Sequence, residues 1–465
     1  MMTTSSSPSP TLARGMRSMF PVNVASQASR RSPPGSGVGD PPREGCRADA
    51  ASVASTVTTH RHTKAQETAT MNGSAHLRTQ GASAVAARGA HVLTALLAGG
   101  VLLSGCAVPA RDVPPTGAAV VEVPIEVADA VATVMEAGAV GVAVDIRDGD
   151  TTASLAEGSA DLRDDRAAQV GDPVRIASIS KTVLAVVVLQ LVEEGELSLD
   201  STVQEVLPGL LDAAPADVTV QQLLAHTSGL PDYIAALAPD VDAAIDGRDA
   251  VYEPRELLSV AQQQSWLAEP GTEFHYSNAG YTVLGLMVEG VTGSTVPDLM
   301  NERVLEPVGM DATQYPTGGA MPDDSMHGYL RIDGDLVDVT DYDPSFWSFG
   351  ASLVSTVGDV SAFNAALQRG DLLQPTTLEQ MRAIGIEGYG LGVLAGGDAC
   401  GAEPPELVFG QRGNGFGYNA ITLASPDGER VVTVAYTGGS FDPATDPIFP
   451  AVGEVVAAAL ASTCP

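Results

Sequence analysis

The chain has 465 residues, of which 44% are hydrophobic and only 17% are charged, so it can bury a large core and is not disordered as a whole. Its formal charge of −33 disfavours binding to nucleic acid, whose phosphates it would repel. Residues 1–105 carry ten basic and four acidic side chains, whereas residues 106–465 carry 14 basic and 53 acidic ones. This asymmetry predicts that the chain consists of two segments that are processed differently.

The basic segment has the order of a leader sequence. Residues 1–70 are rich in Ser, Pro, Arg and Thr, and we expect them to be disordered or to precede the true start. Residues 71–105 combine a basic start with a short apolar stretch, which is typical of a signal peptide. They end in Leu-Ser-Gly before Cys106, which resembles the lipobox of bacterial lipoproteins. We therefore expect export, a lipid on Cys106, a tether over residues 106–119 and a position on the outer face of the cell membrane; an ordinary signal peptide is the alternative.

The body, residues 120–462, begins with a helix pattern at residues 124–136 and strand patterns at 140–146 and 153–158. Asp148-Gly149 is a hairpin signal between these strands. Residues 177–194 are apolar nearly all round and end at Gly195, which predicts a buried central helix.

The rest of the body divides into a helical part and a second group of strands. From residue 196 to about 340 the pattern is one of helices and loops. Strand patterns return at residues 389–394, 407–411, 418–424 and 430–436, and a closing helix is expected at about 449–461. The predicted fold class is α+β: an antiparallel sheet built from both chain ends and flanked by helices, with an inserted all-helical lobe.

Ser178 and Lys181 lie three residues apart at the start of the central helix and so share one face. A serine hydroxyl needs a base to become a nucleophile, and a desolvated amine can be that base, whereas arginine cannot. Apart from Lys64, Lys181 is the only lysine of the chain. That usage favours a need for a titratable amine, although chance survival of one codon would give the same composition.

Two further motifs contain residues that could act on a substrate. In Tyr276-Ser277-Asn278, the tyrosine can transfer protons if nearby cations lower its pKa, and the asparagine can bind a substrate amide. A loop tyrosine packed between lobes is the alternative. The glycine-rich segment at residues 409–418 indicates close backbone approach by a ligand.

The order of these motifs resembles that of the penicillin-recognising serine hydrolases. Ser178-x-x-Lys181, the His-Thr-Ser-Gly-Leu stretch that ends at residue 230, Tyr276-x-Asn278 and the glycine-rich strand follow one another as in class C β-lactamases and D-alanyl-D-alanine carboxypeptidases. The resemblance covers about residues 120–462. It implies that Ser178 is acylated, that Lys181 and Tyr276 share proton transfer, and that Asn278 contacts the substrate amide. It also implies an oxyanion hole made by the backbone N–H groups of Ser178 and Asn414.

The chain departs from this family at one motif. Gln411-Arg412-Gly413 stands where the family has Lys or His, then Thr or Ser, then Gly, and we expect all three residues to contact the substrate. Arg412 is expected to clamp a substrate carboxylate. Because side chains alternate along a strand, Arg412 could instead face away from the site, which would favour an esterase or a binding protein.

Cysteine and histidine usage predicts a disulfide and no metal site. Cys400 and Cys464 are the only pair left in the exported body, and we expect them to be bridged, with two buried thiols as the alternative. His226, His275 and His327 have no ligand spacing, so neither a metal nor a cofactor is expected. We interpret His226, which follows an amphipathic helix, as structural rather than as the base of a Ser-His-Asp triad.

The sequence thus predicts an exported, lipid-anchored serine acyl hydrolase. The favoured activity is that of a D-alanyl-D-alanine carboxypeptidase cleaving a peptidoglycan-type peptide or another small acyl substrate through an acyl-enzyme. A β-lactamase or small-ester esterase on the same fold is one alternative. A catalytically weak binding or regulatory lipoprotein is the other.

Overall fold

The computed structural model describes residues 119–465, except residues 212–213, 403–404 and 443. The predicted extension, the signal peptide and Cys106 lie outside the described residues, so those expectations stay predictions. None of the described helices is both long enough and apolar enough to span a membrane.

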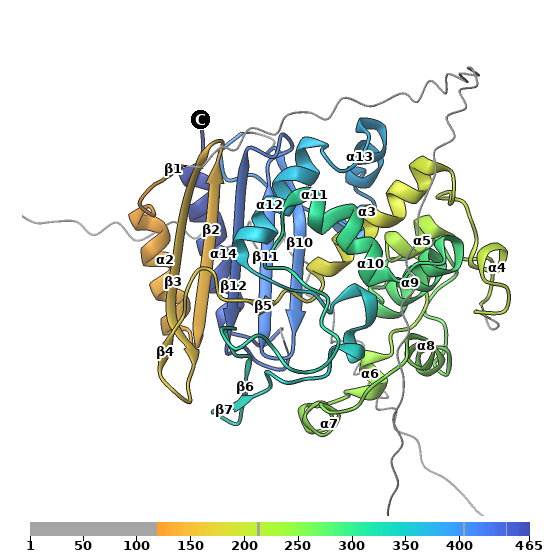
Figure 1. Cartoon of the computed structure of the whole chain (residues 1–465), viewed down its shortest axis with the longest axis horizontal. Helices are drawn as coiled ribbons and strands as arrows, with labels where there is room; N and C mark the ends of the chain where they lie inside the picture. The colour runs from red at the N-terminus through yellow and green to blue at the C-terminus, as the bar shows by residue number, and fades with distance from the viewer. Residues whose placement is uncertain (1–118, 212–213, 403–404, 443) are drawn as a thin grey trace, which may run out of the picture. The chain divides into compact units, whose positions relative to one another are not determined.

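One sheet forms the centre of the described part, with strands in the order β1-β3-β2-β12-β11-β10-β9 and β4 beside β3 (Figure 1). Neighbours are antiparallel except β1 and β3, which are parallel. The strands are β1 (Ala119–Val120), β2 (Gly141–Asp148), β3 (Thr151–Asp161), β4 (Arg166–Ala167), β9 (Leu394–Gly397), β10 (Leu407–Gly415), β11 (Tyr418–Ala424) and β12 (Arg430–Thr437).

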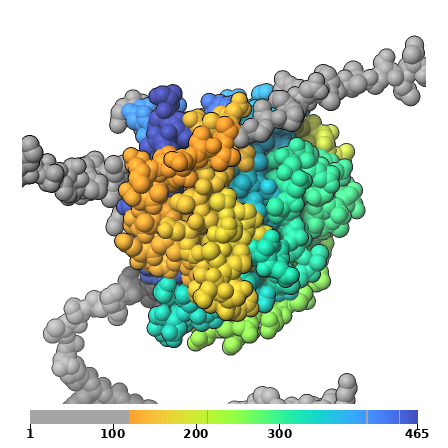
Figure 2. Space-filling view, turned by 60° about the vertical axis from the view of Figure 1, so that its left-hand side comes forward, coloured from red at the N-terminus to blue at the C-terminus, as the bar shows by residue number. Residues whose placement is uncertain are grey.

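The sheet is assembled from both ends of the body. β2 pairs with β12, the last strand, so that Val144 lies opposite Val434. Figure 2 shows the segment that follows residue 118, in orange, beside the C-terminal segment, in blue. The predicted α+β class with a sheet flanked by helices is confirmed.

The two faces of the sheet carry different helices. α2 (Ile125–Glu136) and α14 (Ile448–Ser462) cover one face and pack on alternate residues of β2 such as Val142 and Val144. On the other face, α12 (Val357–Arg369) and α3 (Ile179–Glu194) pack over small side chains that include Ala143 and Ala420. These small side chains allow close approach of the helices to the sheet.

α3 is the buried helix that the sequence predicts. All its residues from Ile179 to Leu189 are buried, and it ends at Gly195 in the left-handed conformation, with φ of 79°. The helices inserted after α3 form the second lobe, with α9 packed against α5, α8 and α3. They are α4 (Val203–Val206), α5 (Val220–Leu224), α6 (Ile234–Leu237), α7 (Val241–Asp246), α8 (Pro254–Gln262), α9 (Asn278–Thr292), α10 (Val296–Met300), η2 (Asn301–Leu305) and α11 (Glu306–Val308).

Two local predictions are wrong. The segment before residue 340 is not purely helical, because β6 (Tyr329–Ile332) and β7 (Asp335–Asp338) form a hairpin around a turn in which Asp333 and Gly334 both have positive φ. The strand expected at residues 389–394 is mostly a turn with Gly392 at φ of 84°, and β9 begins only at Leu394. In both places glycine conformation, rather than apolar alternation, determines the backbone.

The remaining elements connect the two parts. They are the short pair β5 (Val174–Arg175) and β8 (Val354–Ser355), the 3₁₀ helices η3 (Pro344–Gly350) and η4 (Ile386–Gly388), and α13 (Pro375–Arg382). β5 and β8 frame the turn that leads into α3, since the N–H of Ile176 donates to the carbonyl of Leu353.

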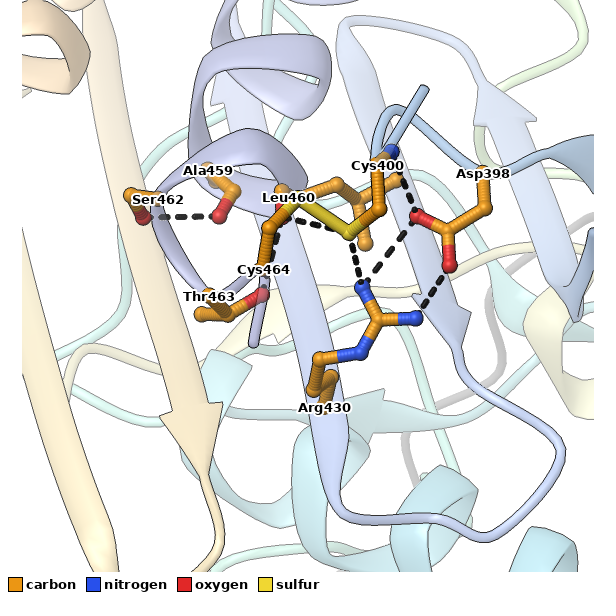
Figure 3. Close-up of a disulfide and its surroundings, with 8 residues drawn as sticks. All are labelled: Asp398, Cys400, Arg430, Ala459, Leu460, Ser462, Thr463 and Cys464. Carbon is orange, nitrogen blue, oxygen red and sulfur yellow. Dashed lines mark hydrogen bonds and ion pairs between the residues drawn. A yellow bond between two sulfur atoms is a disulfide. The ribbon is translucent and has the colours of Figure 1, made fainter. Parts of the chain in front are cut away.

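A disulfide joins Cys400, in the loop between β9 and β10, to Cys464 just after α14, as the sequence predicts (Figure 3). Beside it, Arg430 of β12 forms an ion pair with Asp398 and donates to Cys400 Sγ at 2.9 Å. The bridge therefore fastens the C-terminus to the edge of the sheet.

Candidate active site

Ser178 lies at the N-terminus of α3, directly after a backbone turn with unusual geometry. Ala177 adopts a left-handed conformation with φ of 46°, which is uncommon for a residue with a side chain. The following N–H groups close the turn, since those of Ile179 and Ser180 donate to the carbonyls of Ile176 and Ala177. The first N–H groups of a helix have no carbonyl partner within it, so the N–H of Ser178 can be presented to a bound substrate together with the Ser178 hydroxyl. Ser180 is structural, because its hydroxyl donates to the Ala177 carbonyl.

Lys181 is completely buried beside Ser178. Its Nζ lies 3.1 Å from Ser178 Oγ, 2.7 Å from Asn278 Oδ1 and 3.3 Å from the carbonyl oxygen of Gly350 in η3. Burial lowers the pKa of Lys181 to about 7, against the opposing effect of the Asp232 carboxylate. A substantial fraction of the amine is therefore neutral near pH 7, and neutral amine next to a serine hydroxyl can act as its base.

Tyr276 approaches Ser178 from the segment that precedes α9. Its hydroxyl donates to Ser178 Oγ at 2.8 Å. Burial raises the pKa of Tyr276 well above its ordinary value, while the hydrogen bond to Ser178 and the more distant charge of Arg412 act in the opposite direction. The lowered pKa that a tyrosine base would need is not present, so the resting Tyr276 is a neutral hydrogen-bond donor.

Asn278 begins α9 and connects Lys181 to a carboxylate that the sequence did not single out. Its Oδ1 accepts from Lys181 Nζ at 2.7 Å, and its Nδ2 donates to Asp232 Oδ2, also at 2.7 Å. Both polar atoms of the Asn278 side chain are thus occupied, and one amide hydrogen is left for a substrate. Asp232 follows the His-Thr-Ser-Gly-Leu stretch, but one acid among 53 gives no signal by sequence alone.

β10 brings the glycine-rich motif against Ser178. A Cβ at Gly413 would lie 2.1 Å from the carbonyl oxygen of Ile176 and 3.1 Å from the Ser178 nitrogen, so only glycine allows this approach. The N–H of Arg412 donates to its neighbour's side chain, Gln411 Oε1, and not across the ladder to β11. Because N–H directions alternate along a strand, the N–H of Asn414 points to the same free edge, beyond the end of β9. This orientation fits the expected oxyanion hole of Ser178 and Asn414.

Gln411 does not contact the site as a substrate ligand would. Its side chain is buried, and Nε2 donates to the hydroxyl of Tyr389 at 2.7 Å and to the Gly392 carbonyl at 3.4 Å. Oε1 accepts the Arg412 N–H at 3.0 Å. The expectation that Gln411 binds substrate gains no support from the structure, because its hydrogen-bonding atoms are already engaged with the protein.

Arg412 faces away from Ser178. It lies opposite Ile421 of β11, whose side chain belongs to the core under α2 and α14. Its guanidinium stacks over the ring of Phe449 in α14 at 4.8 Å, and burial lowers its pKa. The expectation that Arg412 binds a substrate carboxylate is wrong, because strand alternation places its guanidinium on the opposite face of the sheet.

His226 is a structural neighbour of the site. Its ring packs on Tyr276 with centroids 4.1 Å apart, and its Nδ1 accepts the N–H of Ser277 at 3.2 Å. Burial lowers the pKa of His226 well below its ordinary value, so the imidazole is neutral. Among residues 119–465, gaps excepted, no cluster of three or more His, Cys, Asp or Glu side chains is arranged to hold a metal ion.

A serine, a buried lysine and a neutral tyrosine, placed where a helix N-terminus meets the edge of an antiparallel sheet, define a serine hydrolase of the Ser-x-x-Lys class. The chain belongs to the Beta-lactamase family, which it matches over residues 127–456.

Similar proteins include peptidases, amidases and esterases. A D-aminopeptidase of Cereibacter sphaeroides is 30% identical over 228 residues, which are 48% of this chain and 42% of that protein. Esterase EstB of Burkholderia gladioli is 34% identical over 179 residues, 36% of this chain and 45% of the esterase. These matches thus span less than half the length of either curated relative.

The fold is similar to that of a solved structure over nearly its whole length. A D-stereospecific amidohydrolase from Streptomyces aligns with a TM-score of 0.65 and 26% identity, covering 73% of this chain and 99% of that one. The chain is therefore a serine hydrolase with the fold of the β-lactamase and penicillin-binding proteins.

Proposed function

We propose that this protein hydrolyses small amides and peptides of D-amino acids through an acyl-enzyme on Ser178, without requiring a free carboxylate on the leaving group. In the first step Ser178 Oγ attacks the substrate carbonyl carbon while the neutral amine of Lys181 takes the serine proton. The N–H groups of Ser178 and Asn414 bind the oxyanion. The C–N bond then breaks, Tyr276 passes a proton to the leaving amine and is reprotonated from Lys181, and water later cleaves the ester.

The observation that carries the substrate choice is the position of Arg412 over Phe449. A D-alanyl-D-alanine carboxypeptidase must recognise the terminal carboxylate, and the sequence assigned that task to Arg412. The guanidinium of Arg412 lies on the opposite face of the sheet, and the neutral side chain of Gln411 is hydrogen-bonded to Tyr389. Neither residue is therefore placed to bind the terminal carboxylate of a substrate. The printed names of the similar D-aminopeptidase and D-stereospecific amidohydrolase support the amide alternative.

One pair of substrates tests this proposal. D-alanyl-D-alanine and D-alanyl-D-alanine amide have the same acyl group and differ in the leaving group only by its carboxylate. We expect the peptide bond of the dipeptide amide to be cleaved at least as fast as the peptide bond of the free dipeptide. Ser178→Ala should abolish both reactions, and Arg412→Ala should change both equally. Strong preference for the free dipeptide, lost selectively in Arg412→Ala, would restore the carboxypeptidase assignment.

A small-ester esterase is the second candidate, and the similarity to Esterase EstB favours it. The same serine, lysine and oxyanion donors would act on an ester, whose leaving alcohol needs less help from a proton donor. Tyr276→Phe distinguishes the two cases: it should slow amide cleavage more than cleavage of an ester with the same acyl group. Equal slowing would favour the esterase. The binding-lipoprotein alternative predicts no acylation of Ser178 by any of these donors.

We also propose that the protein is exported and lipid-anchored through Cys106. The support is the Leu-Ser-Gly-Cys tetrad at the end of the apolar leader stretch. The Cys400–Cys464 disulfide adds to it, because disulfides persist in oxidising compartments.

A further inference from the structure

Asp232 lies behind the active site and contacts the first residue of α9. It is half-buried, in the segment between α5 and α6. Its Oδ2 accepts from Asn278 Nδ2 at 2.7 Å, and its Oδ1 accepts from the N–H of Ile234 at 3.3 Å. Burial raises the pKa of Asp232, whereas the hydrogen bonds from the side chain and the backbone N–H of Asn278 favour its charged form. An anionic group at a helix N-terminus is favourable, so Asp232 is held in one place by several donors.

This carboxylate fixes which way the Asn278 amide is turned. An ionised carboxylate only accepts hydrogen bonds, so the amide must present its NH₂ group to Asp232 and its oxygen to Lys181. The Oδ1 to Nζ distance of 2.7 Å agrees with that orientation. Without the carboxylate, the reversed orientation would be available, with the NH₂ group donating to the neutral amine of Lys181.

The orientation matters because a neutral amine has two hydrogens and one lone pair. The Asn278 oxygen and the Gly350 carbonyl, at 2.7 and 3.3 Å from Lys181 Nζ, are acceptors for the two hydrogens. The lone pair is then left for the third neighbour, Ser178 Oγ, at 3.1 Å. A reversed Asn278 would occupy the lone pair that must receive the serine proton.

We propose that Asp232 is a positioning residue that fixes the Asn278 amide and thereby directs the lone pair of Lys181 at Ser178. Its kinetic consequences rest on the proposed acyl-enzyme function, whereas its effect on the titration of Lys181 does not. Asp232 acts through Asn278 and does not touch the reacting atoms.

The charge of Asp232 gives this role a signature in pH. Its negative charge favours protonated Lys181 and so raises the pKa of that amine, against the larger effect of burial. The other titratable groups near Lys181 are neutral at neutral pH, because burial raises the pKa values of the tyrosines and lowers that of the histidine; they are Tyr276, Tyr281 and His226. Removing the Asp232 charge should therefore lower the pKa of Lys181 below about 7.

The first experiment measures that pKa directly in the full chain. Lys181 is the only lysine of residues 106–465, so lysine labelled with ¹³C at the ε position gives one NMR signal once the leader is removed. In a chain that keeps its leader there are two signals, and Lys64→Arg assigns them. In Asp232→Asn, which keeps shape and loses charge, we expect the pKa of Lys181 to fall by at least half a unit. The matched control is Asp240→Asn, at the exposed N-cap of α7, which should leave it unchanged. An unchanged pKa of Lys181 in Asp232→Asn would overturn the proposal, whatever the enzyme acts on.

The second experiment tests whether Asp232 acts through Asn278. The acylation rate with a chromogenic ester is measured from pH 5 to 9 in the single and double alanine variants. We expect Asp232→Ala to lower the rate at least tenfold at the pH optimum and the double variant to be no slower than Asn278→Ala alone. Additive losses would refute the coupling. Wild-type protein that is not acylated would refute the proposed function, while the NMR titration would still decide the role of Asp232.

Discussion

Replacing Lys181 by arginine should abolish acylation of Ser178 although the side chain stays cationic. Burial lowers the pKa of Lys181 to about 7, so about half of the molecules have a neutral amine at pH 7. Arginine keeps a pKa above about 12, so only about one guanidinium in 10⁵ would be neutral at that pH. Loss of the base by this factor corresponds to about 7 kcal/mol of activation free energy. We expect the measured loss to be at least about 10³-fold, since the oxyanion donors alone retain some catalysis.

The assay is the rate of covalent labelling by a penicillin or a chromogenic ester, followed by stopped flow and by intact mass. Lys64→Arg is the matched control when the chain is expressed with residues 1–105 retained, because it makes the same chemical change at the only other lysine. Lys181→Ala tests whether the larger arginine side chain alone causes the loss. Alanine is smaller than lysine, and its variant should lose acylation to the same extent. In the wild type the rate should rise with pH through about pH 7, as the amine loses its proton. An arginine variant that acylates within about tenfold of wild type would refute the assignment of Lys181 as base.

Three further predictions concern other parts of the chain. Gly413→Ala should lower kcat by about 10²- to 10³-fold and destabilise the fold by about 1–3 kcal/mol, because the added Cβ would lie 2.1 Å from a backbone carbonyl oxygen. The control is Gly396→Ala in β9, where the nearest atom to the added Cβ lies at 3.6 Å. Equal effects of the two substitutions would contradict the reasoning. Replacing Cys400 and Cys464 together by serine should lower the free energy of unfolding by about 2–4 kcal/mol in denaturant titrations. Alkylation of both Cys400 and Cys464 in the unreduced, denatured wild type would disprove the bridge. Cys106→Ser should release the protein from bacterial membranes or stall its processing, and a soluble wild-type chain without lipid mass would rule out the anchor.

The sequence by itself determined the elements whose cause is local. The apolar run of α3, the left-handed Gly195 at its end and the alternation in β2, β11 and β12 gave the expected helix and strands. The i, i+3 spacing of Ser178 and Lys181 was sufficient to place both on one face, because helix geometry fixes that relation. Elimination pointed to Cys400 and Cys464 as the pair, with two buried thiols as the alternative, and the structure joins them in a disulfide.

Only the tertiary structure decided which side chains of β10 face the active site. A strand turns alternate side chains to opposite faces, so a shift of one residue would exchange Gln411 and Arg412. The pairing of Arg412 with Ile421 fixes that parity, and it depends on the register with β11. The sequence left both orientations of Arg412 open, and the first of them was wrong.

The Lys181–Asn278–Asp232 chain likewise exists only in three dimensions. Lys181 and Asn278 are 97 residues apart in sequence, and Asn278 and Asp232 are 46 apart. No periodicity connects positions on different helices, and a single aspartate in so acidic a body is inconspicuous. The packing of α9 against α3 and α5 brings these groups together, and burial there lowers the pKa of Lys181 to about 7.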